Sequence, residues 1–135
     1  AALARELARP GDVRLTLVAR RRPLLEELAA AIGPGPDGAG RCHLVSADLA
    51  TDPTGWLAGA IKAHGPVDVL VNNAGLDLVR GLAESDPEEI ERVLRLNLHT
   101  PLALTRAVLP AMIARRSGTI VDVASVAALA PAQGY

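Results

Sequence analysis

Two amides and a hydroxyl that follow apolar runs are the residues with the clearest chemistry in this sequence. Asn72 and Asn73, succeeded by Ala74 and Gly75, come directly after the run VDVLV, and Ser125 comes just after GTIVDV. Amide groups donate and accept hydrogen bonds, while alanine and glycine let a ligand approach the backbone closely. The pattern favours a ligand site. The alternatives are an ordinary asparagine-rich turn and a serine that only satisfies the backbone.

A basic cluster and an acidic residue stand in the equivalent places after two earlier apolar runs. Arg20, Arg21 and Arg22 follow VRLTLVA, and Asp48, with Leu49 beside it, follows RCHLVS. A guanidinium in that place can pair with a phosphate on an adenosine ribose, the group that distinguishes NADP from NAD. A carboxylate can accept from an adenine amine while leucine packs the ring. The alternatives are a solvated helix start and a simple Asx turn.

A third candidate, Asn97, lies between two leucines in a helical pattern. An amide in a helix interior costs stability unless it has a partner, so Asn97 is either a functional residue or one satisfied by neighbouring backbone. The three histidines show no metal-ligand spacing, and no serine lies in a G-x-S-x-G elbow. We therefore expect no metal site and no serine hydrolase.

The elements that position these residues alternate between helix and strand. Helical patterns cover Ala1 to Arg9, the segment that Pro23 opens, the segment from Asp52-Pro53 to about His64, and a long stretch from the Asp86 cap to about Ile113; strand patterns cover Val13 to Ala19, Arg41 to Ser46, Val67 to Val71 and Gly118 to Val123. This α-β-α-β-α-β-α-β order predicts a parallel sheet with helices on both faces. Ligands bind such sheets beyond the carboxyl ends of the strands, where the candidate residues stand.

The composition excludes several other classes of function. The chain has 135 residues, half of them hydrophobic, and a net charge of −1. It contains two aromatic residues and no apolar run long enough for a membrane span, so we expect neither nucleic acid nor membrane as a partner. A single cysteine, Cys42, excludes an internal disulfide and suits a reducing compartment, so we expect a cytoplasmic protein.

Together these residues resemble the short-chain dehydrogenase/reductase family over essentially the whole chain. The marks are Asn72-Asn73-Ala74-Gly75 after Asp68-Val69-Leu70-Val71, then Leu96-Asn97-Leu98, then Gly118-Thr119-Ile120-Val121 leading to Ser125. The resemblance implies a Rossmann-type doubly wound parallel sheet, incomplete here, in a single partial NAD(P)-binding domain spanning residues 1–135. It also implies a nicotinamide cofactor and a small carbonyl or alcohol substrate. It implies a homo-oligomeric parent protein as well, since members of the family often pair through the long helix.

The resemblance also implies roles for the candidate residues. Ser125 would hydrogen-bond the substrate oxygen, and Asn97 would hold a water in the proton relay. The cofactor would be lined by Asn73, Ala74 and Gly75, its adenine would be flanked by Asp48 and Leu49, and Arg20, with Arg21 as second choice, would favour NADP over NAD.

Two departures from the family pattern carry consequences. The first strand with its glycine-rich turn and the Tyr-x-x-x-Lys pair are not in this sequence; Lys62 lies in an earlier helix, and Tyr135 follows Ser125 by ten positions where about thirteen is usual. We expect the catalytic tyrosine near position 138 and Tyr135 to be a loop or substrate-side residue. Without the first strand we expect two strand pairs with unpaired inner edges, and a chain that is poorly stable and inactive alone.

Three functions remain open from the sequence. The favoured one is an NADP-preferring oxidoreductase acting on a carbonyl/alcohol pair. The second is an epimerase or dehydratase on the same fold that retains a bound cofactor, which a requirement for a sugar-nucleotide substrate would favour. The third is a non-catalytic remnant or pseudoenzyme binding module.

Overall fold

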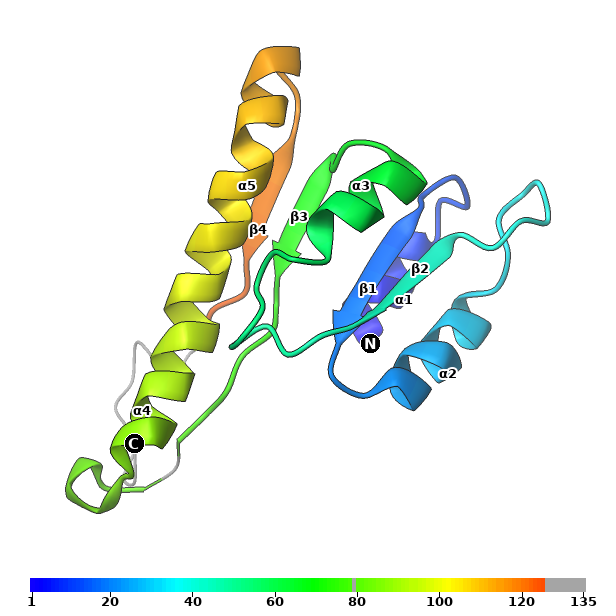
Figure 1. The fold of residues 1–135 in the computed structure, drawn as a ribbon. Helices are drawn as coiled ribbons and strands as arrows, with labels where there is room; N and C mark the ends of the chain where they lie inside the picture. The colour runs from blue at the N-terminus through cyan, green and yellow to red at the C-terminus, as the bar shows by residue number, and fades with distance from the viewer. Residues whose placement is uncertain (79, 126–135) are drawn as a thin grey trace. The chain divides into compact units, whose positions relative to one another are not determined.

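The computed structural model describes residues 1–78 and 80–125, and the backbone divides into two compact units. The first unit comprises residues 1–48 and 55–65, and the second comprises residues 49–54 and those from 66 onward. Each unit contains one pair of parallel strands with its own helices (Figure 1).

The first unit is built on strands β1 (Leu15–Ala19) and β2 (Cys42–Ser46). They pair in parallel from Leu15 opposite Cys42 to Ala19 opposite Ser46. Three helices accompany them: α1 (Ala2–Ala8), α2 (Arg22–Ile32) and α3 (Leu57–His64). Because α2 connects two parallel neighbours, this segment is a β-α-β crossover unit.

Small and aliphatic side chains form the core of the first unit: Ala8, Leu17, Leu25, Leu57 and Ala60 are each at most 9% exposed. One arginine closes the edge of this core. The guanidinium of Arg41 donates to the carbonyls of Ala8 and Gly11 and, at the end of α2, to the carbonyl of Ile32, each at 3.0 Å. The last carbonyls of a helix lack intrahelical donors, so a cation there satisfies them.

The second unit is built on strands β3 (Val69–Asn72) and β4 (Thr119–Asp122), which pair in parallel from Val69 opposite Thr119 to Asn72 opposite Asp122. Between them the chain forms the short 3₁₀ turn η1 (Leu82–Glu84), α4 (Pro87–Leu94), the π-helical turn η2 (Arg95–His99) and α5 (Thr100–Arg115). The run from α4 to α5 is continuous, as Figure 1 shows in yellow-green to orange.

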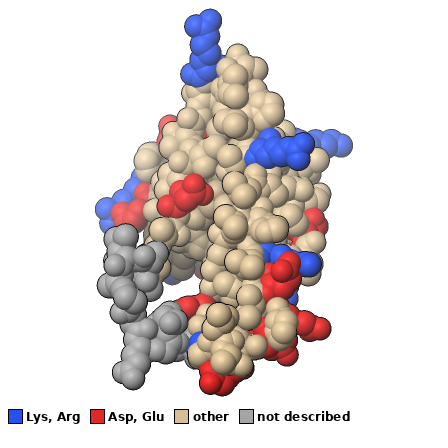
Figure 2. Space-filling model, turned by 90° about the vertical axis from the view of Figure 1, so that its left-hand side faces the viewer, with Lys and Arg blue, Asp and Glu red and all other residues tan. Residues whose placement is uncertain are grey.

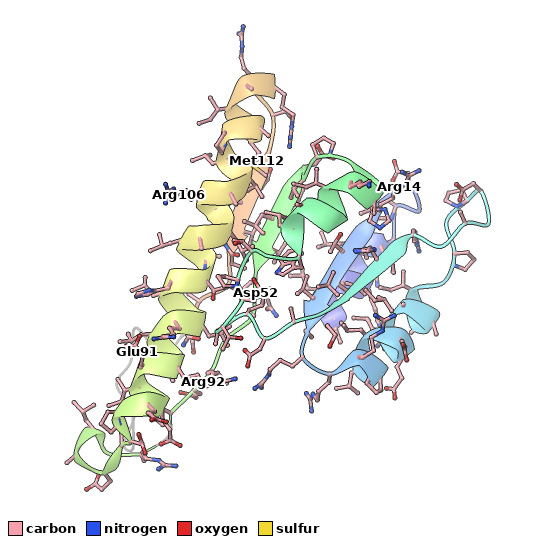
Figure 3. All side chains as sticks on the ribbon, viewed as in Figure 1. Arg14, Asp52, Glu91, Arg92, Arg106 and Met112 are labelled. Carbon is pink, nitrogen blue, oxygen red and sulfur yellow. The ribbon has the colours of Figure 1, made fainter. Side chains whose placement is uncertain are left out.

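Helix α5 buries one side against the strands and leaves another side uncovered. Leu104, Val108 and Met112 are at most 5% exposed, and Figure 3 shows Met112 on the side toward β4 while Arg106 points away. Large apolar side chains are exposed elsewhere along η2 and α5, at Leu98, Leu102, Leu109 and Ile113. Figure 2 shows this largely uncharged surface, with acidic side chains gathered toward the α4 end.

Most of the predicted architecture is confirmed. The helix and strand order is as expected, and the four strands form two separate parallel pairs within the described residues, as predicted for a Rossmann sheet without its first strand. The Asp86 cap is also confirmed, because its Oδ1 accepts from the Glu88 amide at 2.8 Å. Among the described residues no helix is both long and apolar enough to cross a membrane.

Three details of the sequence prediction were wrong. Asp52 does not cap α3, which begins at Leu57, since Gly55 is a poor helix former and the chain turns there first. The predicted single helix to Ile113 contains the π-helical turn η2 and extends to Arg115. The strand predicted from Val67 to Val71 begins two residues later, at Val69, and ends at Asn72.

Candidate active site

The carboxyl ends of β3 and β4 are joined by a side-chain hydrogen bond as well as by the backbone ladder. Asn72 Nδ2 donates to Asp122 Oδ1 at 2.8 Å, and the Val123 amide donates to the Asn72 carbonyl at 2.9 Å. Asn72 is 8% exposed, so its amide is a buried part of the sheet. These contacts fix where the chain leaves each strand, which sets the positions of the segments that begin at Asn73 and lead to Ser125.

Asn97 fixes the segment after β3 from the opposite side. Its Oδ1 accepts from the Leu76 amide at 2.9 Å, and its Nδ2 donates to the Leu76 carbonyl at 2.7 Å. Both halves of the amide are therefore used by one backbone residue. A Cβ built on Gly75 would lie 3.5 Å from Asn97 Oδ1, which shows how closely the two segments approach.

The backbone at Asn97 departs from a regular α-helix. Asn97 is the central residue of the π-helical turn η2, and Pro101, one turn later, has no amide to donate to its carbonyl. π-Turns are frequent at functional sites because they redirect side chains and release backbone carbonyls. The predicted role of Asn97 in a water relay stays a prediction, but its side chain is shown to bond the backbone of Leu76.

Leu49 is held in the second unit by Thr100 at the start of α5. Thr100 Oγ1, which is buried, donates to the Leu49 carbonyl at 2.6 Å, and Leu49 itself is 8% exposed. The loop that begins at Leu49 is therefore docked on the same helical run that carries Asn97. This places one of the two predicted adenine-flanking residues in the second unit.

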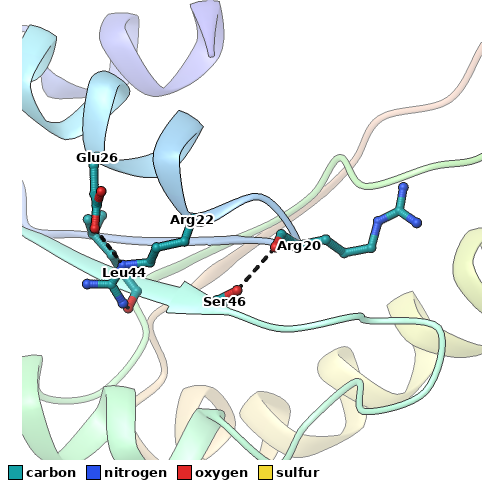
Figure 4. Close-up of polar contacts among 5 residues, drawn as sticks. All are labelled: Arg20, Arg22, Glu26, Leu44 and Ser46. Carbon is teal, nitrogen blue, oxygen red and sulfur yellow. Dashed lines mark hydrogen bonds and ion pairs between the residues drawn. The ribbon is translucent and has the colours of Figure 1, made fainter.

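The arginines belong to the first unit, at the carboxyl end of β1. Ser46 Oγ donates to the Arg20 carbonyl at 3.1 Å, which ties the ends of β1 and β2 together (Figure 4). Arg22 is engaged, because its Nε bonds Glu26 at 2.9 Å and its Nη1 contacts the Leu44 carbonyl at 3.4 Å. In the part of the chain that the structure describes, the guanidiniums of Arg20 and Arg21 have no such partner and are exposed.

The predicted site residues thus fall into two groups. Asp48, half-buried, shares the carboxyl edge of the β1–β2 pair with Arg20 and Arg21. The second unit holds Leu49 and the other candidates: Asn73, Ala74, Gly75, Asn97 and Ser125. Asn73 to Gly75 and Ser125 are exposed just beyond β3 and β4, at one edge of that strand pair. Tyr135 lies outside the described residues.

Other reactive side chains do not form a competing site. Burial raises the pKa of the Cys42 thiol, an effect that the neighbouring Arg41 only partly offsets, so Cys42 is not an activated nucleophile. Within residues 1–78 and 80–125, no group of three or more His, Cys, Asp or Glu side chains is placed to hold a metal ion. Two features fit a nucleotide cofactor. One is the pair of unengaged guanidiniums of Arg20 and Arg21, and the other is the exposed Asn73–Gly75 segment.

Two site-building residues were missed by sequence reasoning. Asp122 has a visible signal, since it is the one charged residue in the apolar run GTIVDV and it stands opposite Asn72. Thr100 has only a weak signal, a hydroxyl residue before a proline in a helical pattern. Its contact with Leu49, more than fifty positions away in the sequence, cannot be read from spacing.

Comparisons with known proteins agree with the fold of this chain. The family model described as short chain dehydrogenase matches residues 1–135. This chain belongs to the short-chain dehydrogenase family. It is 42% identical to bovine dehydrogenase/reductase SDR family member 7B over 92% of its length, and 33% identical to human dehydrogenase/reductase SDR family member 4 over 99%.

Solved structures of this oxidoreductase family show the same fold. A metagenomic short-chain oxidoreductase in complex with NADP has a TM-score of 0.84 at 34% identity, covering 97% of this chain and 59% of that one. L-Sorbose reductase from Gluconobacter frateurii, complexed with NADPH and L-sorbose, has a TM-score of 0.84 at 30% identity, covering 98% and 50%. The chain spans 41% of the bovine and 48% of the human relative, about half their length.

Proposed function

We propose that this chain is the nucleotide-binding part of an NADP(H)-dependent oxidoreductase that interconverts a carbonyl and an alcohol. The observation that carries the proposal is the pair of unengaged guanidiniums, Arg20 and Arg21, beyond β1, where a ribose phosphate binds in folds of this type. NADP and NADPH in the related structures support the same cofactor.

Each group of residues has a distinct task in this proposal. Arg20, with Arg21, binds the ribose phosphate, while Asp48 and Leu49 flank the adenine. The Asn73–Gly75 backbone lies along the cofactor, whose nicotinamide supplies or accepts the hydride when bound. Asn97 keeps that backbone in place through its two bonds to Leu76. Ser125, exposed beyond β4, donates a hydrogen bond to the substrate oxygen and so orients it.

A binding experiment with two matched arginine variants tests the choice of cofactor. Affinities for NADPH and NADH are measured by calorimetry on the chain and on any longer product of its reading frame. Arg20→Ala should weaken NADPH binding by roughly 10- to 100-fold, the size of one or two charge-assisted bonds to phosphate, and leave NADH binding unchanged. Arg22→Ala is the control, because Glu26 and the Leu44 carbonyl already engage its guanidinium.

Two outcomes count against this proposal. If the unchanged chain binds NADPH and NADH with equal affinity, the proposed NADP preference is wrong. If Arg20→Ala and Arg22→Ala weaken NADPH binding equally, the proposed role of Arg20 is wrong. Turnover distinguishes the alternatives, since an oxidoreductase consumes NADPH with a simple carbonyl substrate. An epimerase or dehydratase converts a sugar nucleotide with no net change in nicotinamide absorbance, and a binding module shows nucleotide binding with neither reaction.

A further inference from the structure

Two histidines meet in the first unit, away from all the residues assigned above. His43 lies within β2 and His64 is the last residue of α3. Their ring centroids are 5.2 Å apart, with the ring planes at 75°, so the edge of one imidazole faces the other. Aromatic rings at this separation and angle attract one another, and the contact joins α3 to the strand beneath it.

The surroundings of His64 suit a neutral ring. Its Nε2 is buried and has no hydrogen-bond partner among the described residues. A protonated imidazole carries a hydrogen on both nitrogens, so protonation would make Nε2 a buried N–H donor without an acceptor. The neutral ring avoids this cost when Nδ1 carries its single hydrogen.

The charged groups around His64 act in the same direction. His43 faces it from β2, and Arg14, in the segment before β1, lies at the end of α3 (Figure 3). Lys62 is on the same helix but exposed, and Arg41, next to β2, is engaged by three carbonyls. Position at the carboxyl end of α3 favours a cation, but burial, followed by His43 and Arg14, still lowers the pKa of His64 below its ordinary 6.5.

We propose that the His43–His64 contact is an acid-sensitive latch, which holds α3 against β2 while the His64 ring is neutral and loosens when that ring is protonated. The folded state binds the proton less readily than the unfolded state, so stability is greatest above pH 6.5. It is lost progressively as the pH falls from 6.5 to the lower pKa of the folded state. This inference does not depend on the proposed redox function.

The latch has a defined place in the chain. Through Gly65, where φ is +88°, α3 leads directly into the segment that forms β3 and then Asn73. Loosening α3 therefore releases the connection between the two strand pairs without breaking either pair. Mild acid would make α3 the first helix of the first unit to open.

Direct titration of the three histidines on the full chain by NMR tests the latch. His99, exposed on η2 in the other unit, provides the matched control variant. We expect His64 to titrate below pH 6.5, and the exchange protection of α3 amides to fall over the same pH range. The exchange protection of the α3 amides should fall by up to about tenfold for each pH unit that separates the His64 pKa of the folded state from that of the unfolded state.

Glutamine variants separate the latch from general acid sensitivity. His64→Gln should abolish the pH-dependent part of the α3 exchange, while His99→Gln should leave it unchanged. A His64 that titrates at or above pH 6.5 overturns the proposal, and the wild-type spectrum alone decides this if the variant does not fold. Persistence of the acid-induced exchange in folded His64→Gln overturns it as well.

Discussion

The two parallel strand pairs are fixed in the same way at their amino ends and in different ways at their carboxyl ends. In each pair an arginine just before or near the second strand engages backbone carbonyls. Arg41, before β2, binds the carbonyls of Ala8, Gly11 and Ile32, and Arg115, at the end of α5, binds the Val67 carbonyl and lies 3.4 Å from Asp68. Guanidinium groups suit this task because they present several donors in a fixed plane.

At the carboxyl ends the resemblance stops. At the β3–β4 pair two side-chain amides form hydrogen bonds: Asn72 bonds the Asp122 carboxylate, and Asn97 bonds the Leu76 backbone. In the β1–β2 pair Ser46 Oγ bonds the Arg20 carbonyl, and the side chains of Arg20 and Arg21 are exposed. Orienting a reacting centre requires a rigid support, whereas a phosphate can be bound by flexible cations. Under the proposed function, the carboxyl end of the β3–β4 pair would position the reacting groups, and that of the β1–β2 pair would bind phosphate through charge.

Replacement of Arg41 should have the largest effect of the changes that probe this comparison. Arg41→Ala leaves three partly buried carbonyls without their donor, and we expect a loss of about 3 kcal/mol in the free energy of unfolding. Arg41→Lys should recover only part of this, since an ammonium cannot reach all three carbonyls from one point. Denaturant unfolding followed by circular dichroism measures both.

Arg9→Ala is the matched control for Arg41. The side chains of Arg9 and its ion-pair partner Glu6 are 76% and 57% exposed, and surface pairs of this kind contribute little. If Arg9→Ala and Arg41→Ala are equally destabilising, the carbonyl cluster is not what stabilises the first unit.

The fold was largely predictable because its signals are local. Apolar runs and the Asp86 cap fix the strands and the start of α4 within a few residues. The start of α3 was mispredicted because Asp52-Pro53 is a good capping sequence whose effect is overridden by Gly55. The π-turn at η2 was not predicted, although Pro101 lacks the amide that would bond the Asn97 carbonyl in a regular α-helix.

The sequence selects candidate site residues but not their hydrogen-bond partners. Family resemblance selected Asn97 and Ser125, yet nothing in the sequence shows that the Asn97 amide is used entirely by Leu76. In the same way, three consecutive arginines look equivalent until the structure engages Arg22 with Glu26 and Leu44. Hydrogen-bond partners depend on tertiary packing, which local patterns do not contain.

Replacement of Asn97 sharpens the comparison at the carboxyl end of the β3–β4 pair, with a smaller effect than that of Arg41. Asn97→Ala removes both bonds to Leu76, and we expect a loss of about 1–2 kcal/mol in unfolding free energy. Hydrogen exchange of the Leu76 amide should accelerate, since that donor loses its acceptor. Asn97→Asp should retain protection at the Leu76 amide while losing the bond to its carbonyl.

Arg95→Ala controls for general disturbance of η2, because its side chain is half exposed and bonds only Glu91 among the contacts described. Unchanged exchange at Leu76 in Asn97→Ala would contradict the positioning role of Asn97. The same acceleration in Arg95→Ala would attribute the effect to the π-turn as a whole.

The smallest expected effect comes from two helical ion pairs with the same geometry and opposite order. Glu91 precedes Arg95 on the α4–η2 run, while Arg22 precedes Glu26 on α2, each pair at 2.9 Å and about half exposed. The acid-first order is the more stabilising because it agrees with the helix dipole. Glu91→Gln should therefore destabilise the chain slightly more than Glu26→Gln, and added salt should reduce the difference.

The pH dependence of the Glu91 pair has a definite sign. The hydrogen bond from Arg95, followed by its charge, lowers the pKa of Glu91 below the ordinary 4.5. The pair therefore contributes its stability above pH 4.5 and loses it as the pH falls through the lower pKa of the folded state. Thermal unfolding of the wild type and Glu91→Gln should converge below that pKa. A difference in thermal stability between the wild type and Glu91→Gln that persists in strong acid would mean that Glu91 acts through packing. It would contradict the explanation from the order of charges along the helix.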